Sequence, residues 1–155
     1  MWEVGVNKIV GILAILVLTG CEPENRTPGL WLSGTLQPFP DDWGFVQDHR
    51  EIAIEVATPY FVPHSVTIWC ADFQGDLYVG AAAPDTKNWP GWVMDDPDVV
   101  LKVGDDVYQA TLTRVSEPQQ IDRVRSVYAA KYDLEPQSDY IGWIWSVGPR
   151  VSLDD

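Results

Sequence analysis

Cysteine, histidine and basic side chains are scarce in this chain, and each shortage excludes a class of site. Only Cys21 and Cys70 are present, so a scaffold held by several disulfides is excluded. The two histidines, His49 and His64, have no metal-ligand spacing to each other or to a cysteine. Lysine and arginine total 10 against 23 acidic residues, a formal charge of −13. We therefore predict no nucleic-acid partner, because proteins bind nucleic acids with basic side chains that neutralise phosphates.

Signatures of catalytic and metal sites are also missing. The chain contains no nucleophile elbow, no phosphate-binding loop, no zinc signature and no supported pair of catalytic carboxylates. Its acidic pairs lack the alternating ligands and distal glutamate of a calcium loop, and they stand where turns favour aspartate: Asp41–Asp42, Asp95–Asp96 and Asp105–Asp106. The sequence therefore predicts no catalytic residue and no metal ligand.

The one long apolar run, from Ile9 to Leu18, is too short for a membrane-spanning helix, which needs about 17 to 25 apolar residues. It ends in Leu18-Thr19-Gly20-Cys21. This ending resembles the bacterial lipobox, which implies a diacylglyceryl thioether on Cys21, cleavage before it and acylation of the new amino terminus. Residues 1–20 are then a lipoprotein signal peptide. The alternatives are an uncleaved membrane anchor and a buried hydrophobic strand.

The mature chain is expected to form one domain behind a lipid anchor. Residues 21–29 are polar and contain two prolines, so they are predicted to link the acylated Cys21 to a domain over residues 30–155. Two acyl chains anchor a soluble domain stably, whereas an anionic lipid surface repels one of this charge. The expected location is the bacterial cell envelope, on the non-cytoplasmic side of either the inner or the outer membrane.

Strand patterns dominate the domain. Two hairpins are predicted, one within residues 66–80 that turns at 73–76, and one that turns at 104–106. The strands expected outside the first hairpin cover residues 30–37, 51–57, 98–103, 107–115 and 140–147. Mostly antiparallel pairing of this kind favours a small barrel or a curved sheet.

Helices are expected at three places. Ser116 and Gln119 fit a capping box and Pro118 suits a first turn, so one helix is predicted from residue 117 to about 132. Asp41 is expected to cap a single turn that runs to residue 47, and Pro90 fits the start of a short helix within residues 87–95. The fold class is thus mainly β with one late helix and one or two short ones.

Several stretches together suggest a family: VTIWCADFQGDLYVG (66–80), the segment with Trp89 and Trp92, DDPDVVLKVGDDVYQATLTRV (95–115) and a helix ending VYAAKYD (127–133). They resemble the split β-barrel proteins related to pyridoxamine-phosphate oxidase, in particular uncharacterised and deazaflavin-dependent nitroreductase-like branches. The resemblance implies a small split barrel of about six to seven mostly antiparallel strands. It also implies FMN or deazaflavin at the barrel edge, often at a homodimer interface, with the phosphate held by Arg, Lys, Ser and Thr.

The sequence departs from this family where the cofactor phosphate is expected. After residues 77–80, where many relatives have arginines or serines, the chain reads AAAPDTK. Thr86 and Lys87 are the only local phosphate partners, and Asp85 opposes an anion. Export of an unfolded chain, as a lipobox implies, also counts against a preloaded cofactor.

Seven tryptophans follow the predicted signal peptide, and five of them are assigned to two groups. Trp89 and Trp92, beside Lys87, are candidates for a ligand-stacking surface, although they could instead plug the barrel. Trp69, Trp143 and Trp145 are expected in the core. Cys70 is expected to be a buried, inert thiol, since no basic residue is its neighbour in sequence.

Three hypotheses on function remain open. The leading one is a lipid-anchored envelope protein that binds a small ligand or a partner protein without catalysis, with Thr86, Lys87, Trp89 and Trp92 as candidate binding residues. The alternative is a flavin- or deazaflavin-dependent oxidoreductase, with Thr86, Lys87 and Trp89 near the cofactor. The third is a purely structural envelope protein, which full burial of the Trp89–Trp92 segment would favour.

Overall fold

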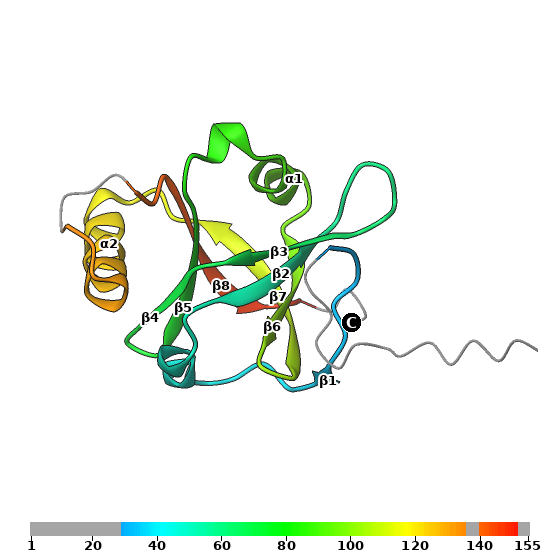
Figure 1. Cartoon of the computed structure of the whole chain (residues 1–155), viewed down its shortest axis with the longest axis horizontal. Coiled ribbons are helices and arrows are strands. Elements are labelled where there is room, and N and C mark those ends of the chain that lie inside the picture. The colour runs from blue at the N-terminus through cyan, green and yellow to red at the C-terminus, as the bar shows by residue number, and fades with distance from the viewer. Residues whose placement is uncertain (1–28, 136–139, 152–155) are drawn as a thin grey trace, which may run out of the picture.

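The computed structural model describes residues 29–135 and 140–151 of the chain (Figure 1). The predicted signal peptide, Cys21 and nearly all of the predicted tether lie outside these residues. The described residues contain eight strands: β1 (Thr35–Leu36), β2 (Ile52–Val56), β3 (His64–Ile68), β4 (Cys70–Phe73), β5 (Asp76–Ala81), β6 (Asp98–Val103), β7 (Asp106–Arg114) and β8 (Trp143–Pro149). The helical elements are η1 (Gly44–Asp48), η2 (Pro84–Thr86), α1 (Trp89–Asp95) and α2 (Pro118–Tyr132).

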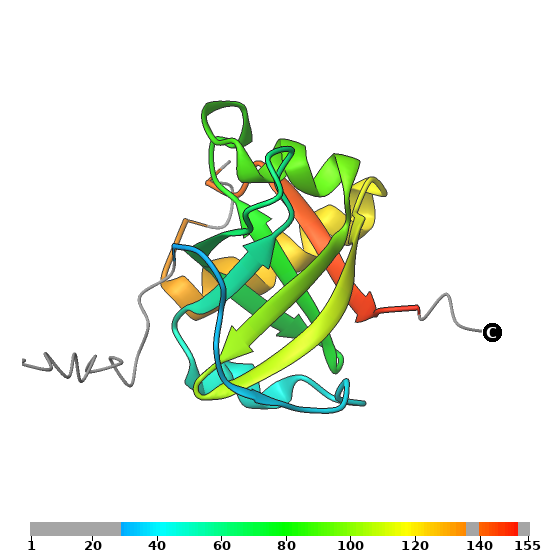
Figure 2. The same cartoon turned by 90° about the vertical axis from the view of Figure 1, so that its right-hand side faces the viewer.

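The strands form one strongly curved sheet. Its order is β3-β2-β6-β7-β8-β5-β4, with every neighbouring pair antiparallel, and β1 adds to β7 in parallel. The two strands at the ends of this order, β3 and β4, are consecutive in the chain and are separated only by Trp69. The segment 64–73 therefore joins both edges and closes the sheet into a small barrel (Figure 2). The predicted mainly antiparallel split barrel is confirmed.

Both predicted hairpins are confirmed, and their turn residues explain them. Gln74 and Gly75 lie at φ +57° and +88° between β4 and β5, and Gly104 lies at φ +59° between β6 and β7. Tight hairpin turns need positive φ at such positions, which glycine adopts without steric cost.

The strand prediction for residues 30–37 is wrong over most of its length. Only Thr35 and Leu36 pair, with Asp106 and Val107 of β7, and both are exposed. The alternating pattern there has no core face to bury. A backbone contact explains the short pairing, because Gly34 lies so close to the Asp105 carbonyl that any side chain would collide with it.

The late helix α2 is confirmed, but its cap is not the predicted one. The Glu117 carboxylate accepts hydrogen bonds from the backbone N–H groups of Gln119 (3.0 Å) and Gln120 (2.6 Å), and Ser116 is not the cap. Pro118 occupies the first helical position, which leaves residue 117 to cap the helix. The predicted cap of η1 is also off by one residue. The backbone N–H of Gly44 donates a hydrogen bond to the carboxylate of Asp42 (2.7 Å) rather than to that of Asp41.

Two apolar clusters hold the fold together. The barrel interior contains Trp43 and Trp145, each 1 % exposed, and α2 packs against the outside of the barrel over β4 (Figure 1). Under α2 the buried Tyr128 hydroxyl lies 3.1 Å from the carbonyl oxygens of both Trp69 and Tyr78. The short helix α1 covers one end of the barrel. Neither of these helices, nor either 3-10 turn, is long and apolar enough to cross a membrane.

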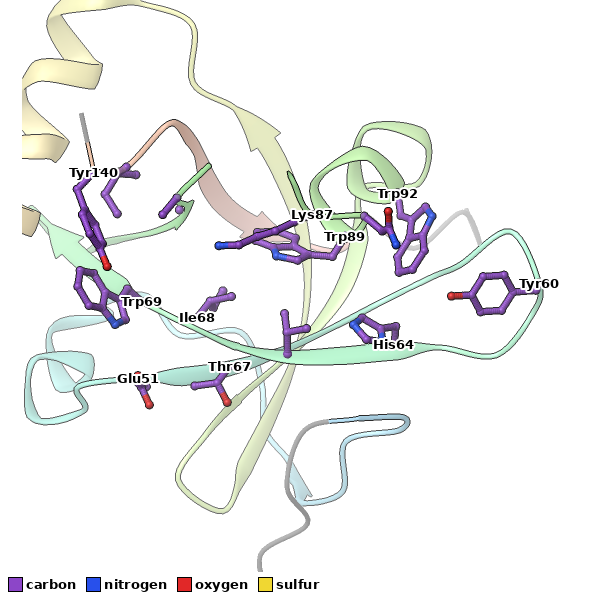
Figure 3. Close-up of a pocket in the computed structure, with 15 residues that line it drawn as sticks. Glu51, Tyr60, His64, Thr67, Ile68, Trp69, Lys87, Trp89, Trp92 and Tyr140 are labelled. Atoms are coloured by element: carbon purple, nitrogen blue, oxygen red, sulfur yellow. The ribbon is translucent and has the colours of Figure 1, made fainter. Parts of the chain in front are cut away.

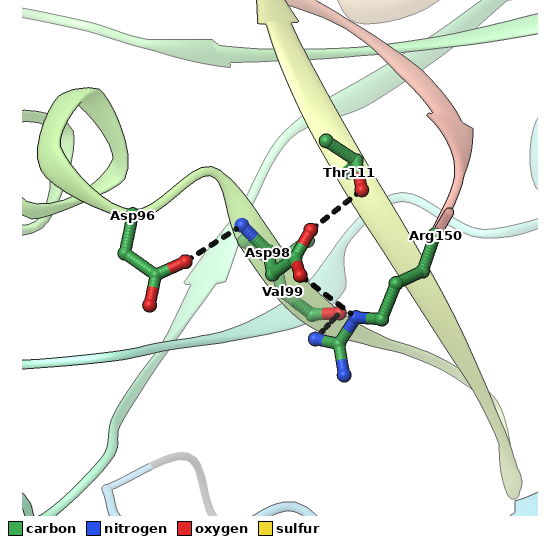
Figure 4. A network of polar contacts seen from close by, with 5 residues as sticks. All are labelled: Asp96, Asp98, Val99, Thr111 and Arg150. Carbon is green, nitrogen blue, oxygen red and sulfur yellow. Dashed lines mark hydrogen bonds and ion pairs between the residues drawn. The ribbon is translucent and has the colours of Figure 1, made fainter. Parts of the chain in front are cut away.

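The last strand begins later and ends later than predicted. It covers Trp143 to Pro149, and Pro149 pairs with Ala110 of β7 where β5 no longer runs beside it. Beyond it, Arg150 contacts Asp98 (3.5 Å) and donates to the Val99 carbonyl (3.3 Å), as Figure 4 shows. These contacts tie the end of β8 to the start of β6.

Candidate functional site

A cavity of about 640 Å³ opens between β3 and the segment that leads from β5 into α1 (Figure 3). This volume lies within the range of about 300 to 1,000 Å³ typical of small-molecule sites. Six of the residues that line it have aromatic rings: Tyr60, His64, Trp69, Trp89, Trp92 and Tyr140. Gly80 and Ile141 also line it, and a side chain at residue 80 would collide with Ile141. Aromatic rings therefore make up much of the cavity lining.

One wall of the cavity is built on α1. Trp89 is buried and its ring centroid lies 5.4 Å from that of Trp145 in the core. One helical turn later, Trp92 is partly buried and meets two rings edge to face, those of Tyr60 (5.8 Å, 89°) and His64 (5.6 Å, 80°). Pro90 within the first turn sets the start of this helix. The wall is thus held by the core on one side and by the β2–β3 loop on the other.

The other wall is a stack of three rings. Trp69 lies between Tyr132 (4.2 Å, 5°) and Tyr140 (5.1 Å, 21°). Tyr132 is fixed in turn, because its hydroxyl accepts a hydrogen bond from the Cys70 N–H (2.9 Å) and lies 2.7 Å from the Arg50 carbonyl oxygen. The prediction that Trp69 is a core residue is confirmed only in part, because Trp69 is partly buried and packs against the apolar cluster under α2. It stands between β3 and β4 and is one of the residues that line the cavity.

Polar groups in the cavity are few. Lys87 is the only lysine or arginine among the lining residues, and its side chain runs across the cavity beside Trp89 (Figure 3). Glu51 is the only carboxylate among the lining residues, which also include the polar side chains of Thr67, Asn88 and His64. The lining therefore holds one basic and one acidic side chain among its aromatic rings.

Three of the four candidate binding residues predicted from the sequence meet here. Lys87, Trp89 and Trp92 line the cavity. Thr86 is not among the lining residues, and its hydroxyl donates a hydrogen bond to the Ala83 carbonyl (2.8 Å) within η2. That these residues bind a ligand stays a prediction.

Sequence reasoning missed four of the six aromatic lining residues, namely Trp69, Tyr60, His64 and Tyr140. His64, considered from the sequence only as a metal ligand, begins β3, is partly buried and lies against Trp92. Tyr60 lies in the loop before it, and Tyr140 reaches the stack from the far end of the chain. The one local feature of the sequence that points to this part of the site is the pair Pro59 and Pro63, which indicates a constrained loop around Tyr60.

The two remaining core predictions and the Cys70 prediction have mixed outcomes. Trp145 is buried as expected, whereas Trp143 is only partly buried, with the Arg114 guanidinium 4.3 Å from its ring centroid. Cys70 is fully buried, and burial raises the pKa of its thiol. A basic group is nevertheless close in space, since Lys131 Nζ lies 3.5 Å from the sulfur. Burial outweighs that ammonium, so the thiol stays protonated.

The basic residues near α2 form no anion site. Arg125 Nη2 donates to the Ile141 carbonyl (3.2 Å), Lys131 Nζ donates to the Val46 carbonyl (2.9 Å), and Arg114 packs on Trp143. Each is thus used in a different part of the fold. Within residues 29–135 and 140–151, no three His, Cys, Asp or Glu side chains gather as metal ligands would.

Comparison with known proteins places the fold. The chain matches no protein-family model and no curated protein. It is similar in structure to a conserved hypothetical protein from Mycobacterium tuberculosis, at 19 % identity over 77 % of this chain and 86 % of that one, with a TM-score of 0.54. A candidate pyridoxamine 5′-phosphate oxidase from Listeria innocua has 14 % identity, 68 % and 88 % coverage and a TM-score of 0.52.

A third solved structure, described as an F420-H2 dependent reductase, has 15 % identity over 64 % of this chain and 94 % of that one, with a TM-score of 0.52. At these identities the likeness shows the fold alone. The chain therefore has the split-barrel fold shared by pyridoxamine-phosphate-oxidase-like and F420-dependent reductase proteins.

Proposed function

We propose that the cavity binds a flat aromatic small molecule with at most one negative charge. The observation that carries this proposal is the arrangement of two preformed aromatic walls, Trp89–Trp92 on one side and Trp69–Tyr140 on the other, with Lys87 between them. Flat rings bind well between such walls because each face covers a large apolar area.

The walls support this proposal because they are held in place before any ligand arrives. Trp69 is stacked on Tyr132, and Trp89 packs on Trp145 in the core. A site that is already ordered loses little conformational entropy on binding. Lys87 supplies one positive charge for an anionic substituent, and Glu51 in the same lining disfavours a second negative charge.

A flavin or deazaflavin is the second candidate ligand, because the structural neighbours include proteins described as F420-dependent reductases. The two aromatic walls fit a tricyclic ring, and Lys87 is the residue that would hold its phosphate. When bound, such a group supplies hydride-transfer chemistry. Only one cation lines the cavity, so this chain's residues fit the ring better than the phosphate.

We further propose that the domain is held at the cell envelope by acyl chains on Cys21, as the lipobox-like sequence indicates. Replacing Cys21 by Ser should leave an unprocessed precursor and abolish labelling with radioactive palmitate. Unchanged processing and membrane association of the Cys21→Ser variant would refute the anchor.

The ligand proposal is tested by titrating the acylated protein with three flat aromatic probes. They are riboflavin, flavin mononucleotide and the monoanion 8-anilinonaphthalene-1-sulfonate. Saturable quenching of tryptophan fluorescence is expected, and it should weaken in Trp92→Ala but not in Trp31→Phe, since Trp31 does not line the cavity. If all three probes leave the fluorescence of the unmodified protein unchanged, the cavity is not such a site.

A further inference from the structure

The loop between β2 and β3 presents an apolar tip to solvent. Phe61 is 97 % exposed, Tyr60 is 57 % exposed and Val62 is 39 % exposed. Residues 56–63 contain no charged side chain, although the chain as a whole carries −13. A nearly fully exposed phenylalanine in such an acidic protein is a feature that neither the core nor the cavity explains.

The tip is held in one conformation. Phe61 lies at φ +64°, a strained value for a bulky residue, and its N–H donates to the Thr58 carbonyl (3.3 Å). The Thr58 hydroxyl donates to the Val62 carbonyl (2.7 Å), and Pro59 and Pro63 restrict the two ends of the loop. The fold therefore keeps these apolar side chains outward.

The chain enters the described domain beside this tip. The Gly29 N–H donates to the Ser65 hydroxyl (2.6 Å), and the Ser65 N–H donates to the Gly29 carbonyl (3.3 Å). The Leu32 N–H binds Glu55, which pairs with Ser65 in the β2–β3 hairpin one step before the loop. Between these anchor points lie two more exposed apolar residues, Leu30 (53 %) and Trp31 (55 %).

Chain length keeps this end of the barrel near the predicted anchor. Gly29 follows Cys21 by eight residues, which span at most about 26 to 29 Å when fully extended. An acyl chain on Cys21 would therefore hold Leu30, Trp31 and the β2–β3 tip close to the bilayer that it enters. Such tethering raises the local concentration, so a weak contact is enough to orient the domain.

We propose that Leu30, Trp31, Tyr60, Phe61 and Val62 form a membrane-contact surface that rests in the lipid interface and orients the anchored domain. This inference depends on the proposed acylation of Cys21 for its location. Tyrosine and tryptophan prefer the interface between lipid headgroups and hydrocarbon, where the ring is apolar and its polar end stays hydrated. The uncharged tip avoids the repulsion that the rest of the acidic domain would meet at a lipid surface.

Charges next to the tip indicate which lipids it accepts. Phe61 lies in a shallow hollow together with Glu55, Asp96, Asp98 and Arg150. Arg150 is already engaged by Asp98, as Figure 4 shows, which leaves this flank acidic. The contact should therefore form with zwitterionic headgroups and weaken as anionic lipid is added.

The test places a polarity-sensitive fluorophore on Phe61→Cys in the full-length protein, purified from membranes and bound to phosphatidylethanolamine–phosphatidylcholine vesicles. Cys70 is buried and does not compete for the label, and mass spectrometry reports the state of Cys21. The matched control is Asp105→Cys, which is exposed at the β6–β7 turn. The register of β2 with β6 puts that turn at the opposite end of the barrel.

A blue shift of the emission at position 61 and none at position 105 is the expected result. Acylated protein without a shift at position 61 overturns the contact surface while leaving the anchor intact. Absence of acylation refutes the anchor. In that case the label at position 61 is measured in the Cys21→Ser variant with vesicles in excess, where a blue shift supports the contact surface and no shift overturns it. A blue shift that appears without vesicles and grows with protein concentration would mean that the tip contacts a second copy of the chain. That result would overturn the proposal that the tip contacts lipid.

Discussion

The two α-helices of this domain differ in how they are built and in what lies beneath them. The fifteen residues of α2 begin after the capping side chain of Glu117. They include the buried Tyr128 and Tyr132, whose hydroxyls contact the backbone carbonyls of Trp69 and Cys70. The seven residues of α1 have no side-chain cap, and they carry the partly buried Trp92 at the cavity. The smaller apolar cluster lies under α2, whereas α1 contributes Trp89 to the barrel core and Trp89 and Trp92 to the cavity lining.

Removal of the buried ring of Tyr128 on α2 should give the largest loss of stability. Tyr128→Ala removes a fully buried ring and its backbone contacts, so we expect the free energy of unfolding to fall by about 3 to 5 kcal/mol. Chemical denaturation measures this loss. Trp92→Ala under α1 is the comparison, and it should cost clearly less because Trp92 is only partly buried. Equal losses would show that the two helices do not differ in this way.

Raising the pH should weaken the packing around α2. Burial raises the pKa of the Cys70 thiol above its ordinary 9.0 and the pKa of the Tyr128 and Tyr132 hydroxyls above their ordinary 10.0. A raised pKa means that the folded state holds the proton more tightly than the unfolded state. The stability from these groups is therefore complete below about pH 9 and is lost as the pH rises through their raised values.

Denaturation curves from pH 7 to pH 11 measure this loss. Cys70→Ala should remove the part that begins near pH 9, because only the thiol has an ordinary pKa that low among the three groups. A free energy of unfolding that stays constant up to pH 11 would contradict the burial of these groups.

The Trp92→Ala variant should have its main effect on binding. Loss of one aromatic face is worth about 0.5 to 1.5 kcal/mol, or up to roughly tenfold in affinity for a flat ligand. Fluorescence titration with 8-anilinonaphthalene-1-sulfonate measures it. Tyr132→Phe serves as a control, since it keeps the ring that supports Trp69 and removes only the hydroxyl. If Trp92→Ala binds the probe as tightly as the unmodified protein, the α1 wall is not part of the site.

The α2 cap should have a smaller effect on stability. Glu117→Ala removes the acceptor for two backbone N–H groups and should cost about 1 kcal/mol. Ser116→Ala should be nearly neutral because Ser116 is not the cap. Thermal denaturation of both variants shows which residue caps the helix. If Ser116→Ala lowers the melting temperature more than Glu117→Ala does, the capping box expected from the sequence is correct.

The smallest expected effect is that of the cavity charge. Lys87→Met should weaken binding of flavin mononucleotide a few-fold and leave riboflavin unchanged, because an exposed ion pair is worth about 0 to 1 kcal/mol. The difference should shrink as salt is added. Equal weakening of both ligands would mean that Lys87 acts through packing rather than charge.

Local patterns account for the parts of the fold that were predicted correctly. The hairpins at Gly75 and Gly104 and the helix after Pro118 depend on residues within a few positions of one another, and turn or helix chemistry acts at that range. The failures came where distant residues decide. The stretch before Thr35 has a strand-like pattern but no partner along most of its length, and partners are set by the whole sheet.

The candidate site shows the same division. Lys87, Trp89 and Trp92 could be predicted together because they lie within six positions of one another. Their partners in the cavity could not, since Tyr60, His64 and Tyr140 reach it from separate parts of the chain.

By itself, the sequence determined the antiparallel hairpins, the late helix and the class of fold, since these follow from periodicity and turn residues. Tertiary structure decided that Trp69, between the two edge strands, both packs against the cluster under α2 and lines the cavity. It also decided that Lys131 lies beside Cys70, although 61 positions separate them. Barrel closure brings such distant residues together, and no local pattern records which ones will meet.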